Sequence, residues 1–520
     1  MVNTSKPNII MIVLDTHRAD RLGFNGCQRG TSPNLDSFAQ GSTIFDNAIA
    51  PAQWTIPSHA SMFCGEYPSV HRTLQSSDAI NTSLKTVAEH LLQAGYSTIG
   101  FCNNPLVGVL DNGFRRGFQR FYNYGGTVPS TPLTYGETTN GLFNKIRQHY
   151  FRIIDRLATP IQQAVAASPK VLQIALNPWL VPLWTRYSNF KGDTESSIKD
   201  TARFLAKSRR GDNREPHFIF LNLMETHLPY TPPKSFIQKF APIVLDEPEA
   251  QEFIQVYNTQ ALKWLLPLEN PYPDIIDKTL HSMYDAEVAY QDHLLNQLLT
   301  ILDTPEHRQN SLVIIVADHG EMLGEHQIMG HGLGVHEELV RVPLVIRFPG
   351  QEDGARVESV VSTVNLFHTI LDAAGIRQDD LEETDWETIA QLSLGNQSTA
   401  SVPVFSEAYA PFNLILILEK YAPDLLAKFH CRDTRWAVYD QSYKMIRVEN
   451  QYDEIFDYMD DPREQQDLYP NLSAATDFVE KLDNFLEYAK YKAADSDLAS
   501  AGRIEDEAVL QRLRNLGYIE

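Results

Sequence analysis

The chain has 520 residues and carries 66 acidic against 44 basic side chains, so its formal net charge is −22 at neutral pH. This balance excludes a general nucleic-acid binder, because such proteins need clustered positive charge. The hydrophobic share of 43% is typical of a globular protein, and the length favours one large domain with a smaller one. The four cysteines form no Cys-x-x-Cys pair, so neither a disulfide framework nor a structural zinc knuckle is expected.

The first apolar run predicts a buried strand. Six apolar residues, several of them β-branched, occupy positions 9–14 and end at Asp15. The run is far shorter than the roughly 18 residues that a membrane span needs, and no small-residue cleavage site follows it. We therefore expect a strand that is covered on both faces of a parallel sheet, in a cytoplasmic protein.

The segment QWTIPSHASMFCGEYPS, residues 53–69, predicts a helix that begins with a hydroxyl group. Thr55 is placed to cap this helix, Pro57 fits its first turn, and Gly65 is suited to end it. The first turn of a helix offers N–H groups to an anion, and a hydroxyl at its tip faces the same anion. The segment by itself leaves two interpretations open, a nucleophile and a plain helix cap.

Further short apolar runs alternate with helical patterns along the chain. The expected strands are 97–102, 217–224, 311–317 and 342–348, and the expected helices are 84–94, 194–207 and 275–302. This alternation predicts an α/β fold with a large, mostly parallel sheet sandwiched by helices. Ligands of such sheets gather beyond the carboxyl ends of the strands. The polar residues that end these runs are therefore candidates for a site: Asp15, Glu225 with His227, and Asp318 with His319.

The stretch 157–185 fits neither pattern. Lys170 is its only charged residue, and four prolines exclude one continuous spanning helix. We expect an apolar helical insertion here. A segment packed on the domain, a lid, a dimer patch and a peripheral membrane contact all remain open.

After about residue 400 the pattern changes. The segments 436–448 and 452–458 are typical of antiparallel strands joined by a turn, and a helical tail follows. We therefore expect two domains: a large α/β domain over 1–415, which contains the insertion 157–185, and a small C-terminal α+β domain with an antiparallel sheet over 416–520.

Three groups at the ends of distant strands predict a metal site. A single aspartate after a strand is most often a turn former, but Asp15, Asp318 and His319 should meet at one sheet edge. Together they offer oxygen and nitrogen ligands for one divalent ion, which could be Mn, Zn, Ca or Mg. Thr55 would complete the ion's shell, and the ion would lower the pKa of this hydroxyl, which is otherwise a poor nucleophile at neutral pH.

The motifs, in their order along the chain, resemble the sulfatase family of the alkaline phosphatase superfamily. The resemblance rests on PNIIMIVLDTHRADRLGFNG (7–26), TIPSHASMFCG (55–65), NLMETHLPYTPP (222–233), VADHGEMLGEHQIMGHG (316–332), EELVRVPLVIRFPG (337–350) and IFDYMDDPREQQDL (455–468). The ending RLRNLGYIE (512–520) resembles that of members with threonine at the nucleophile position. The resemblance implies an alkaline phosphatase-like domain with a metal site at the sheet edge, a smaller C-terminal domain, and hydrolysis of anionic esters.

The chain departs from the family pattern at the site itself. Sulfatases proper carry a Cys or Ser that is oxidised to formylglycine, whereas this chain has Thr55, a secondary alcohol that cannot give that aldehyde. His59 replaces an arginine, Thr16 a second aspartate, and His331 a lysine that grips the sulfate. Threonine nucleophiles of the superfamily act on phosphoesters. We therefore expect the threonine-nucleophile, non-formylglycine branch, hydrolysing phosphate mono- or diesters, with a sulfuric ester hydrolase (sulfatase or arylsulfatase) and a non-catalytic anion-binding protein as alternatives.

The catalytic roles follow from the residues and the resemblance together. Thr55 is expected to attack, and His59, His227 and His331 are the further catalytic candidates. His227 and His331 would grip substrate oxygens or protonate the leaving alcohol. With Glu225 they could also hold a second metal ion. The expected substrate is a small-molecule or lipid-like anionic ester and not nucleic acid; the oligomeric state stays open.

Some charged residues near the predicted metal ligands are expected to have structural rather than catalytic roles. Arg18 should contact Asp20 or support the metal ligands. Glu321 and Glu325 should lie on the exposed side of the turn after the predicted metal ligands, and His336 should be structural.

Overall fold

The computed structural model describes residues 6–125, 191–208, 215–376, 403–449, 451–470, 475–493 and 502–503. The insertion predicted at 157–185 and the chain ending 512–520 lie outside the described residues. Within the described part of the chain, no helix combines the length and the apolar character that crossing a membrane requires.

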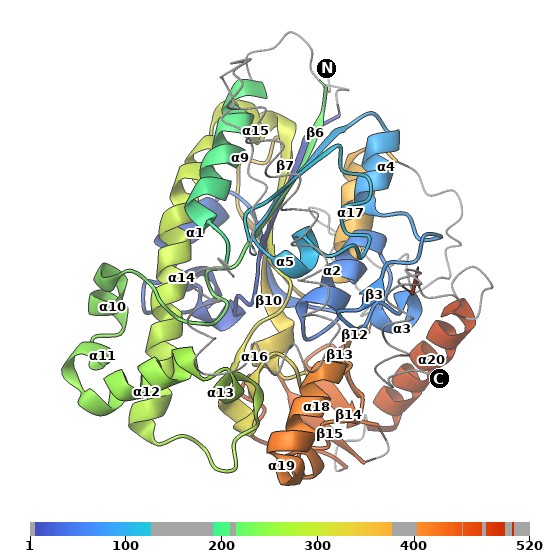
Figure 1. Ribbon diagram of the computed structural model, residues 1–520. Helices are drawn as coiled ribbons and strands as arrows, with labels where there is room; N and C mark the ends of the chain where they lie inside the picture. The colour runs from blue at the N-terminus through green and yellow to red at the C-terminus, as the bar shows by residue number, and fades with distance from the viewer. Residues whose placement is uncertain are drawn as a thin grey trace, which may run out of the picture.

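An eight-stranded, mostly parallel sheet lies at the centre of the molecule (Figure 1). In spatial order its strands are β11 (Ala355–Ser362), β2 (Thr43–Ile49), β10 (Arg341–Arg347), β7 (Ser311–Ala317), β1 (Asn8–Leu14), β6 (His217–Leu223), β4 (Ser97–Cys102) and β5 (Arg120–Asn123). Every neighbouring pair is parallel except the two that β10 makes, with β2 and with β7. The five strands predicted from the apolar runs are confirmed, each within one residue at either end.

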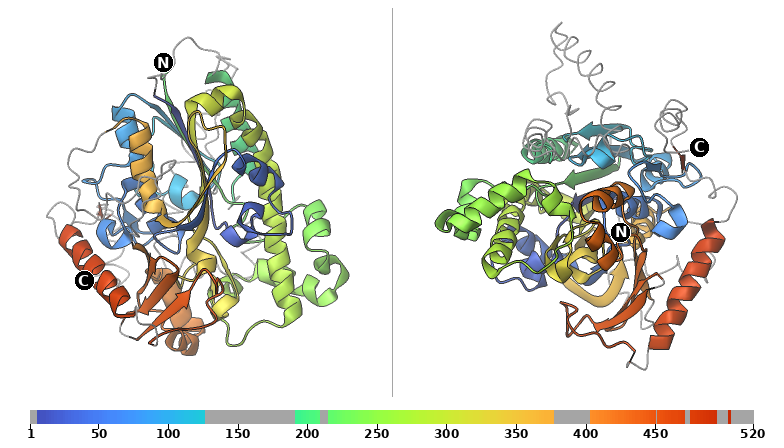
Figure 2. Two further views of the ribbon diagram at one scale, coloured as in Figure 1. Left: turned by 180° about the vertical axis from the view of Figure 1, so that it is seen from behind. Right: turned by 60° about the horizontal axis from the view of Figure 1, so that its bottom comes forward.

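Helices cover both faces of this sheet, as the α/β prediction requires (Figures 1 and 2). One face is covered by α1 (Pro33–Ala39), α9 (Thr194–Ser208) and α14 (Asp274–Leu302), and the other by α2 (Thr55–Cys64), α4 (Val87–Gln93) and α17 (Leu366–Ala373). The helices predicted at 194–207 and 275–302 are confirmed as α9 and α14. Because both faces are covered, the apolar residues of β1 from position 9 to 14 are fully buried.

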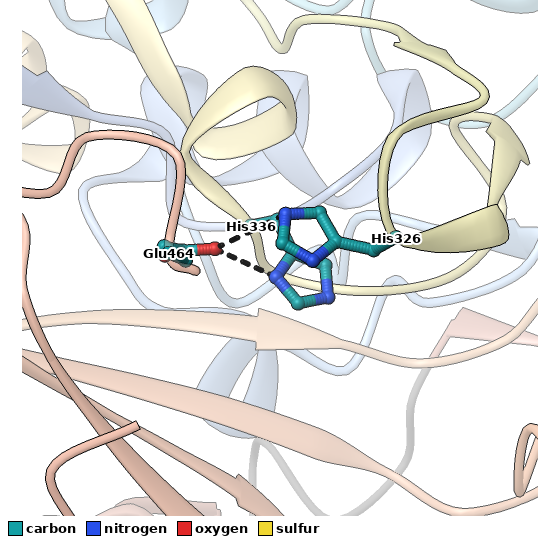
Figure 3. Close-up of side chains that lie close together, drawn as sticks. All are labelled: His326, His336 and Glu464. Atoms are coloured by element: carbon teal, nitrogen blue, oxygen red, sulfur yellow. Dashed lines mark hydrogen bonds and ion pairs between the residues drawn. The ribbon is translucent and has the colours of Figure 1, made fainter. Parts of the chain in front are cut away.

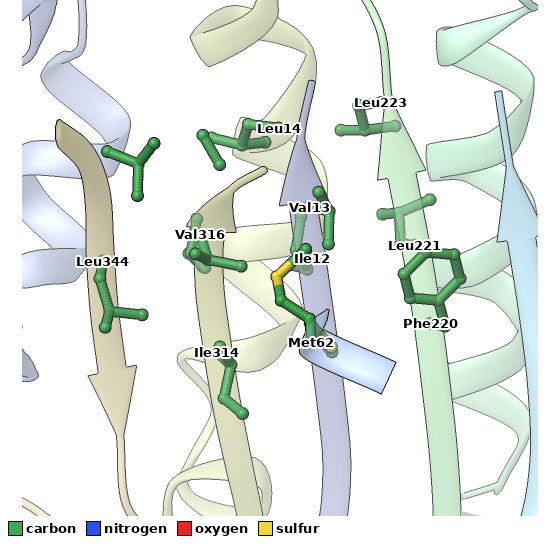
Figure 4. Packing of buried hydrophobic residues seen from close by; sticks show 14 of the residues in the cluster. Ile12, Val13, Leu14, Met62, Phe220, Leu221, Leu223, Ile314, Val316 and Leu344 are labelled. Carbon is green, nitrogen blue, oxygen red and sulfur yellow. The ribbon is translucent and has the colours of Figure 1, made fainter. Parts of the chain in front are cut away.

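Helix α2 is buried along its whole length, which makes it part of the core. Figure 4 shows Met62 of this helix packed among the apolar side chains of the central strands, near Ile12 of β1. Its polar residues need partners in such a place: the Ser58 hydroxyl donates to the carbonyl of Asp318 at 2.6 Å, and Ser61 bonds to Nε2 of His71 at 3.0 Å. Gly65 ends the helix with a left-handed φ of 75°, as predicted.

Smaller elements extend from this core. They are α3 (Pro68–His71), α5 (Pro105–Gly108), α10 (Lys234–Phe240), α11 (Ile243–Asp246), α12 (Pro248–Thr259), α13 (Leu262–Leu265), α15 (Pro305–Asn310), α16 (Glu337–Val340), the hairpin of β8 (Met322–Leu323) and β9 (Met329–Gly330), and the pair β3 (Asp78–Ala79) and β16 (Gly502–Arg503). The hairpin of β8 and β9 is important for the site because it lies in the chain between the candidate residues Asp318 and His319 on one side and His331 on the other.

A second, four-stranded antiparallel sheet forms the small C-terminal domain, at the bottom of Figure 1. Its strands are β12 (Val404–Ala408), β13 (Arg435–Asp440), β14 (Tyr443–Val448) and β15 (Tyr452–Asp457), accompanied by α18 (Phe412–Tyr421), α19 (Pro423–Lys428) and α20 (Ala475–Ala493). The predicted antiparallel sheet is confirmed. Strand β12 precedes residue 416 and pairs with β13, so the smaller sheet includes a strand from before the expected boundary.

Helix α4 is shorter than the predicted helix 84–94, because a capping box sets its start. Thr86 accepts a hydrogen bond from the backbone N–H of Glu89 at 3.2 Å, and Glu89 accepts one from the N–H of Thr86 at 2.8 Å. These two bonds satisfy N–H groups that the first turn leaves unpaired, so the chain enters the helix at Val87.

Replacing Thr86 by Ala should weaken the start of α4. The lost cap costs about 0.5–2 kcal/mol, so hydrogen exchange at the first-turn amides should speed up about two- to thirty-fold. Thr86→Ser keeps the hydroxyl and is the matched control, with exchange close to that of the wild type. Equal exchange in the wild type and Thr86→Ala, measured amide by amide, would show that the capping box does not hold this helix end.

Candidate active site

The carboxyl ends of three neighbouring parallel strands define the site. Strand β1 pairs with β7 on one side and with β6 on the other, and Leu14 lies opposite Ala317 in this register. The next residues, Asp15 and Asp318, therefore leave the sheet side by side. The backbone N–H of Asp15 still bonds to the carbonyl of Leu223 in β6 at 2.9 Å, which fixes the direction of the chain at this point.

The predicted metal-ligand group is brought together by this register. One ligand atom each from Asp15, Asp318 and His319 lies within 4.8 Å of the others, and all three residues are fully buried. Oδ1 of Asp15 and Oδ2 of Asp318 are buried and have no hydrogen-bond partner in the described part of the chain. A buried carboxylate oxygen without a partner is costly, whereas a divalent cation between these atoms would satisfy both. The residues present therefore fit a cation.

The second oxygen of each carboxylate is held by the protein. Asn104 donates to Oδ2 of Asp15 at 2.6 Å, and the backbone N–H groups of Thr16 and His319 donate to Oδ1 of Asp318 at 3.2 and 3.0 Å. Thr16 occupies the place of the family's second aspartate, and its backbone amide supports the remaining one. These bonds orient each carboxylate and leave one oxygen to face the cluster.

Burial and the nearby charges shift the pKa values of the cluster in different directions. Burial raises the pKa of Asp15, and the charge of Asp318 raises it further. Burial also acts to raise the pKa of Asp318, but His319 and His59 outweigh it, and this pKa falls to about 2. Burial lowers the pKa of His319 to about 4, so its imidazole is neutral at neutral pH. A neutral imidazole has the lone pair that a metal ligand needs.

Thr55 is the first residue of α2 and not its cap, which corrects the prediction. The N-cap position belongs to Trp54, and no side chain caps the helix. His319 bonds through Nδ1 to the carbonyl of Gly320 at 2.8 Å, which leaves Nε2 to accept from the Thr55 hydroxyl at 3.3 Å. The hydroxyl thus faces a member of the metal-ligand group instead of the N–H groups of its own helix.

His59 lies one helical turn after Thr55 and supports the site from inside the protein. Its Nδ1 is 3.0 Å from the carbonyl oxygen of Thr55 and 3.3 Å from Oδ2 of Asp318. Its Nε2 accepts from the Asn222 amide at 3.3 Å. Both ring nitrogens face protein groups and the side chain is fully buried. This place fits a residue that positions Thr55 and Asp318.

His227, which the strand-end argument predicted, and His331, which the family resemblance suggested, both lie beside the metal-ligand group. The ring of His331 lies 4.7 Å from that of His319 and 5.1 Å from that of His227. Nδ1 of His227 donates to the carbonyl of Leu228 at 2.8 Å. Burial lowers the pKa of His227, and the neighbouring His331 lowers it further. His227 is therefore the neutral member of this pair.

Glu321 favours the protonated form of His331. Its Oε1 accepts from Nδ1 of His331 at 2.9 Å. Burial acts to lower the pKa of His331, but the charge and the hydrogen bond of Glu321 outweigh it, and the pKa is raised. The predicted exposed place of Glu321 is therefore wrong: the residue is fully buried, because the chain turns inward after β7. Its neighbour Glu325 is also not on an exposed side, since it forms an ion pair with Arg18 at 2.5 Å.

The structure also tests the predicted contact of Arg18 and the predicted second metal site. Arg18 pairs with Asp20 at 2.8 Å, as expected. The second metal site does not form as predicted: two groups of candidate ligands occur among the described residues, and neither contains Glu225. The backbone carbonyl of Glu225 instead accepts a hydrogen bond from Lys191 at 2.8 Å.

Sequence reasoning missed three residues that hold the site: Asn104, Asn222 and Glu321. Asn104 follows β4 by two residues, and Asn222 is the penultimate residue of β6. The rule that polar groups gather at the carboxyl ends of strands therefore applies to both. Glu321 has no such signal, because nothing local shows that its turn is buried.

Comparison with known proteins gives a consistent result. The family model described as Sulfatase matches residues 7–376. The arylsulfatase of Clostridium perfringens is 25% identical over 393 residues, which cover 73% of this chain and 77% of that protein. The choline-sulfatase of Rhizobium meliloti is 23% identical over 477 residues, which cover 90% and 84%.

Among solved structures, the phosphonate monoester hydrolase of Agrobacterium radiobacter superposes with a TM-score of 0.62 at 19% identity, covering 95% of this chain and 97% of that one. The fold, with its large mixed sheet between helices and its small antiparallel domain, is the alkaline phosphatase-like fold. The family match extends over most of the chain and includes Asp15, Thr55, Asp318 and His319. The chain therefore belongs to the sulfatase family of ester hydrolases.

Proposed function

We propose that this protein hydrolyses phosphate mono- or diesters with Thr55 as the nucleophile, in a threonine branch of the family that does without formylglycine. The observation that carries the proposal is the place of the Thr55 hydroxyl. It stands at the start of α2, 3.3 Å from Nε2 of His319, which belongs to the buried metal-ligand group.

The choice of phosphorus over sulfur follows from the chemistry of a threonine ester. A phosphorylated threonine can be cleared by attack of water at phosphorus. Sulfatases instead clear the sulfated intermediate by elimination from a hydrated aldehyde, and the secondary alcohol of Thr55 cannot supply that aldehyde. The likeness to a phosphonate monoester hydrolase supports the proposal, since the same fold there houses an enzyme named for phosphorus esters.

In the proposed reaction, each step is carried out by a particular residue of the chain. The Thr55 hydroxyl loses its proton to solvent, its oxygen attacks phosphorus, and the bond from phosphorus to the leaving oxygen breaks in line with this attack. His331, held in its protonated form by Glu321, gives a proton to the leaving oxygen. In the second step water gives a proton to His331, its oxygen replaces Thr55 on phosphorus, and the released Thr55 oxygen takes up a proton from solvent, which restores the hydroxyl. His227 stays neutral and lies next to His331, where it can grip a substrate oxygen.

Enzymes of the sulfatase family use a divalent metal ion, and the residues here fit one. Asp15, Asp318 and His319 would hold it, with Thr55 next to His319. When bound, such an ion lowers the pKa of a nearby hydroxyl and neutralises charge on the substrate. Two carboxylates and one imidazole accept Mn, Zn, Ca or Mg, so the identity of the ion is a matter for measurement.

Hydrolysis of sulfuric esters is the second candidate function. It is favoured by the names of the curated relatives, an arylsulfatase and a choline-sulfatase. The two candidates share the fold, the metal-ligand group and the in-line geometry, and they differ in how the intermediate is cleared. A screen of aryl phosphates, phosphodiesters, phosphonate esters and aryl sulfates separates them. A clear preference for sulfates would favour the second candidate.

Replacing Thr55 by Val should abolish turnover while keeping the shape of the side chain. Without a nucleophile, hydrolysis of an aryl phosphodiester should fall by about 10⁴-fold or more. Thr55→Ser keeps a hydroxyl and should remain active, and a mass spectrum of the quenched wild type should show phosphate on the peptide that contains residue 55. Wild-type rates in Thr55→Val would remove Thr55 from the mechanism.

Replacing Asp318 by Asn should weaken metal binding at the active site. The change keeps the volume of the side chain and removes one of the two negative charges, so affinity should fall by more than the roughly 10–100-fold seen for supporting residues. Metal analysis after dialysis measures this. Asp274→Asn is the matched control, because its side chain is 97% exposed. Equal metal content in the wild type and Asp318→Asn would exclude Asp318 as a ligand.

Replacing His331 by Asn should affect substrates according to their leaving groups. A protonated His331 helps only when the leaving oxygen is basic, so alkyl esters should lose about 10²–10⁴-fold in kcat/KM, and esters of acidic phenols should lose much less. Rates measured over a series of phenols and alcohols provide the test. An equal loss across the series would assign His331 to substrate binding instead of proton transfer.

A further inference from the structure

A second group of metal-ligand candidates lies outside the active site, where the large domain meets the small one. His326, His336 and Glu464 each place one ligand atom within 4.8 Å of the others (Figure 3). His326 follows the strand β8, His336 immediately precedes α16, and Glu464 lies in the turn after β15. Glu464 and His336 are 128 residues apart in the sequence, so only the tertiary fold brings them together.

The two imidazoles face the same carboxylate oxygen. Their rings stack with centroids 3.9 Å apart and an interplanar angle of 5°. Oε2 of Glu464 accepts from Nδ1 of His336 at 2.6 Å, and it lies 3.9 Å from Nε2 of His326, as the dashed lines in Figure 3 show. Only one of the two rings therefore makes a real hydrogen bond to Glu464.

Two buried polar atoms of this group lack any hydrogen-bond partner among the described residues. They are Nε2 of His326 and Oε2 of Glu338, a residue of α16, and they lie 3.8 Å from each other. The side chain of Glu338 is only 8% exposed, and that of Glu464 is fully buried. Buried polar atoms of native proteins are rarely left unpaired. The pair therefore points to a ligand that is shared by His326, Glu338 and Glu464.

The distances favour a cation as that ligand. Separations of 3.8 and 3.9 Å are too long for a hydrogen bond. Two ligands of one zinc ion, with bonds of about 2.0–2.2 Å, lie about 3.4 Å apart at a tetrahedral angle and no more than about 4.3 Å apart. One ion can therefore reach Nε2 of His326 together with the oxygens of Glu338 and Glu464.

The charges around this group are more negative than positive, so a divalent cation would balance them. Three carboxylates meet here, because Glu337 lies next to Glu338 and shares Lys444 with Glu464. Lys444 is 2.5 Å from Glu464 and 3.2 Å from Glu337, and it supplies one positive charge. Arg18, whose charge acts on Glu338, is already paired with Asp20 and Glu325.

We propose that His326, His336, Glu338 and Glu464 form a second divalent-cation site, with Zn²⁺ as the best-suited ion. Two imidazoles and two carboxylates are a donor set that suits zinc in tetrahedral coordination. On binding, the ring of His336 turns out of its stack with His326, because the in-plane lone pairs of two parallel rings cannot meet at one ion. The nitrogen of His336 that faces the ion is then its unprotonated one, and the hydrogen bond to Glu464 is replaced by a shared ion. All four residues line a cavity of about 1370 Å³, which gives an ion access to them.

The proposed ion would join the large domain to the small one next to the chain segment that carries His331. Three of its ligands come from the large domain and Glu464 comes from the small one. His331, the proposed proton donor, lies between His326 and His336 in the chain. An ion held at both ends of this segment fixes its position against the small domain.

Zinc stoichiometry tests the site independently of the active-site metal. The full-length protein is stripped with a chelator, dialysed against Zn²⁺ and analysed for bound metal. In the Asp15→Asn/Asp318→Asn background, which disables the active-site group, one equivalent should remain bound. Adding His326→Gln and His336→Gln to that background should remove it. His281→Gln is the matched control, since His281 lines the same cavity but pairs with Asp277 outside the ligand group.

Two further measurements keep the test decisive if the combined variant folds poorly. Glu338→Gln alone, in the wild-type background, should weaken the second equivalent of Zn²⁺ by at least tenfold, and Co²⁺ in the Asp15→Asn/Asp318→Asn protein should give the visible absorption of a tetrahedral site. His326→Gln/His336→Gln with an intact active site should still bind one equivalent of Zn²⁺, at Asp15, Asp318 and His319, and should lose the second equivalent. Absence of a bound equivalent in the Asp15→Asn/Asp318→Asn protein, or its retention after both histidines are replaced, would overturn the proposal.

Discussion

The parallel pairing of β1 with β7 and β6 is the constraint on which the rest of the site depends. The register that sets Leu14 opposite Ala317 makes Asp15 and Asp318 leave the sheet at one place. Apolar contacts on both faces hold this register, because a slip by one residue would turn buried side chains of β1 to the opposite face of the sheet. The chemistry of the site thus rests on the packing of a core that takes no part in it.

Asp15 and Asp318 are two buried carboxylates of like charge, and the two oxygens of each have different surroundings. One oxygen of Asp15 is held by Asn104, and one oxygen of Asp318 is held by two backbone amides. The other oxygen of each carboxylate has no hydrogen-bond partner among the described residues. Such an arrangement is costly without a counterion and favourable with one, so these residues fit a cation.

The segment after β7 links the active site to the small domain. It carries His319 next to the Thr55 hydroxyl and, after a buried turn, His331, which is hydrogen-bonded to Glu321. It then reaches Glu464 of the C-terminal domain through His336. One segment therefore connects the small domain with residues beside the candidate metal-ligand group. This connection links the position of the C-terminal domain to that of the large domain's candidate site.

The sequence by itself determined five strands of the central sheet and the helices α9 and α14, because apolar periodicity is a local signal. It also named Asp15, Asp318 and His319 as candidate ligands and Thr55 as the candidate nucleophile. Only the tertiary structure decided which supporting groups face the site. Asn222 and Glu321 became partners of histidines, and Thr55 turned toward His319 instead of capping its helix. The contact of His336 with Glu464 was likewise invisible beforehand. The physical reason is that the burial of a turn and the meeting of distant side chains depend on how whole elements pack, and no local pattern contains that information.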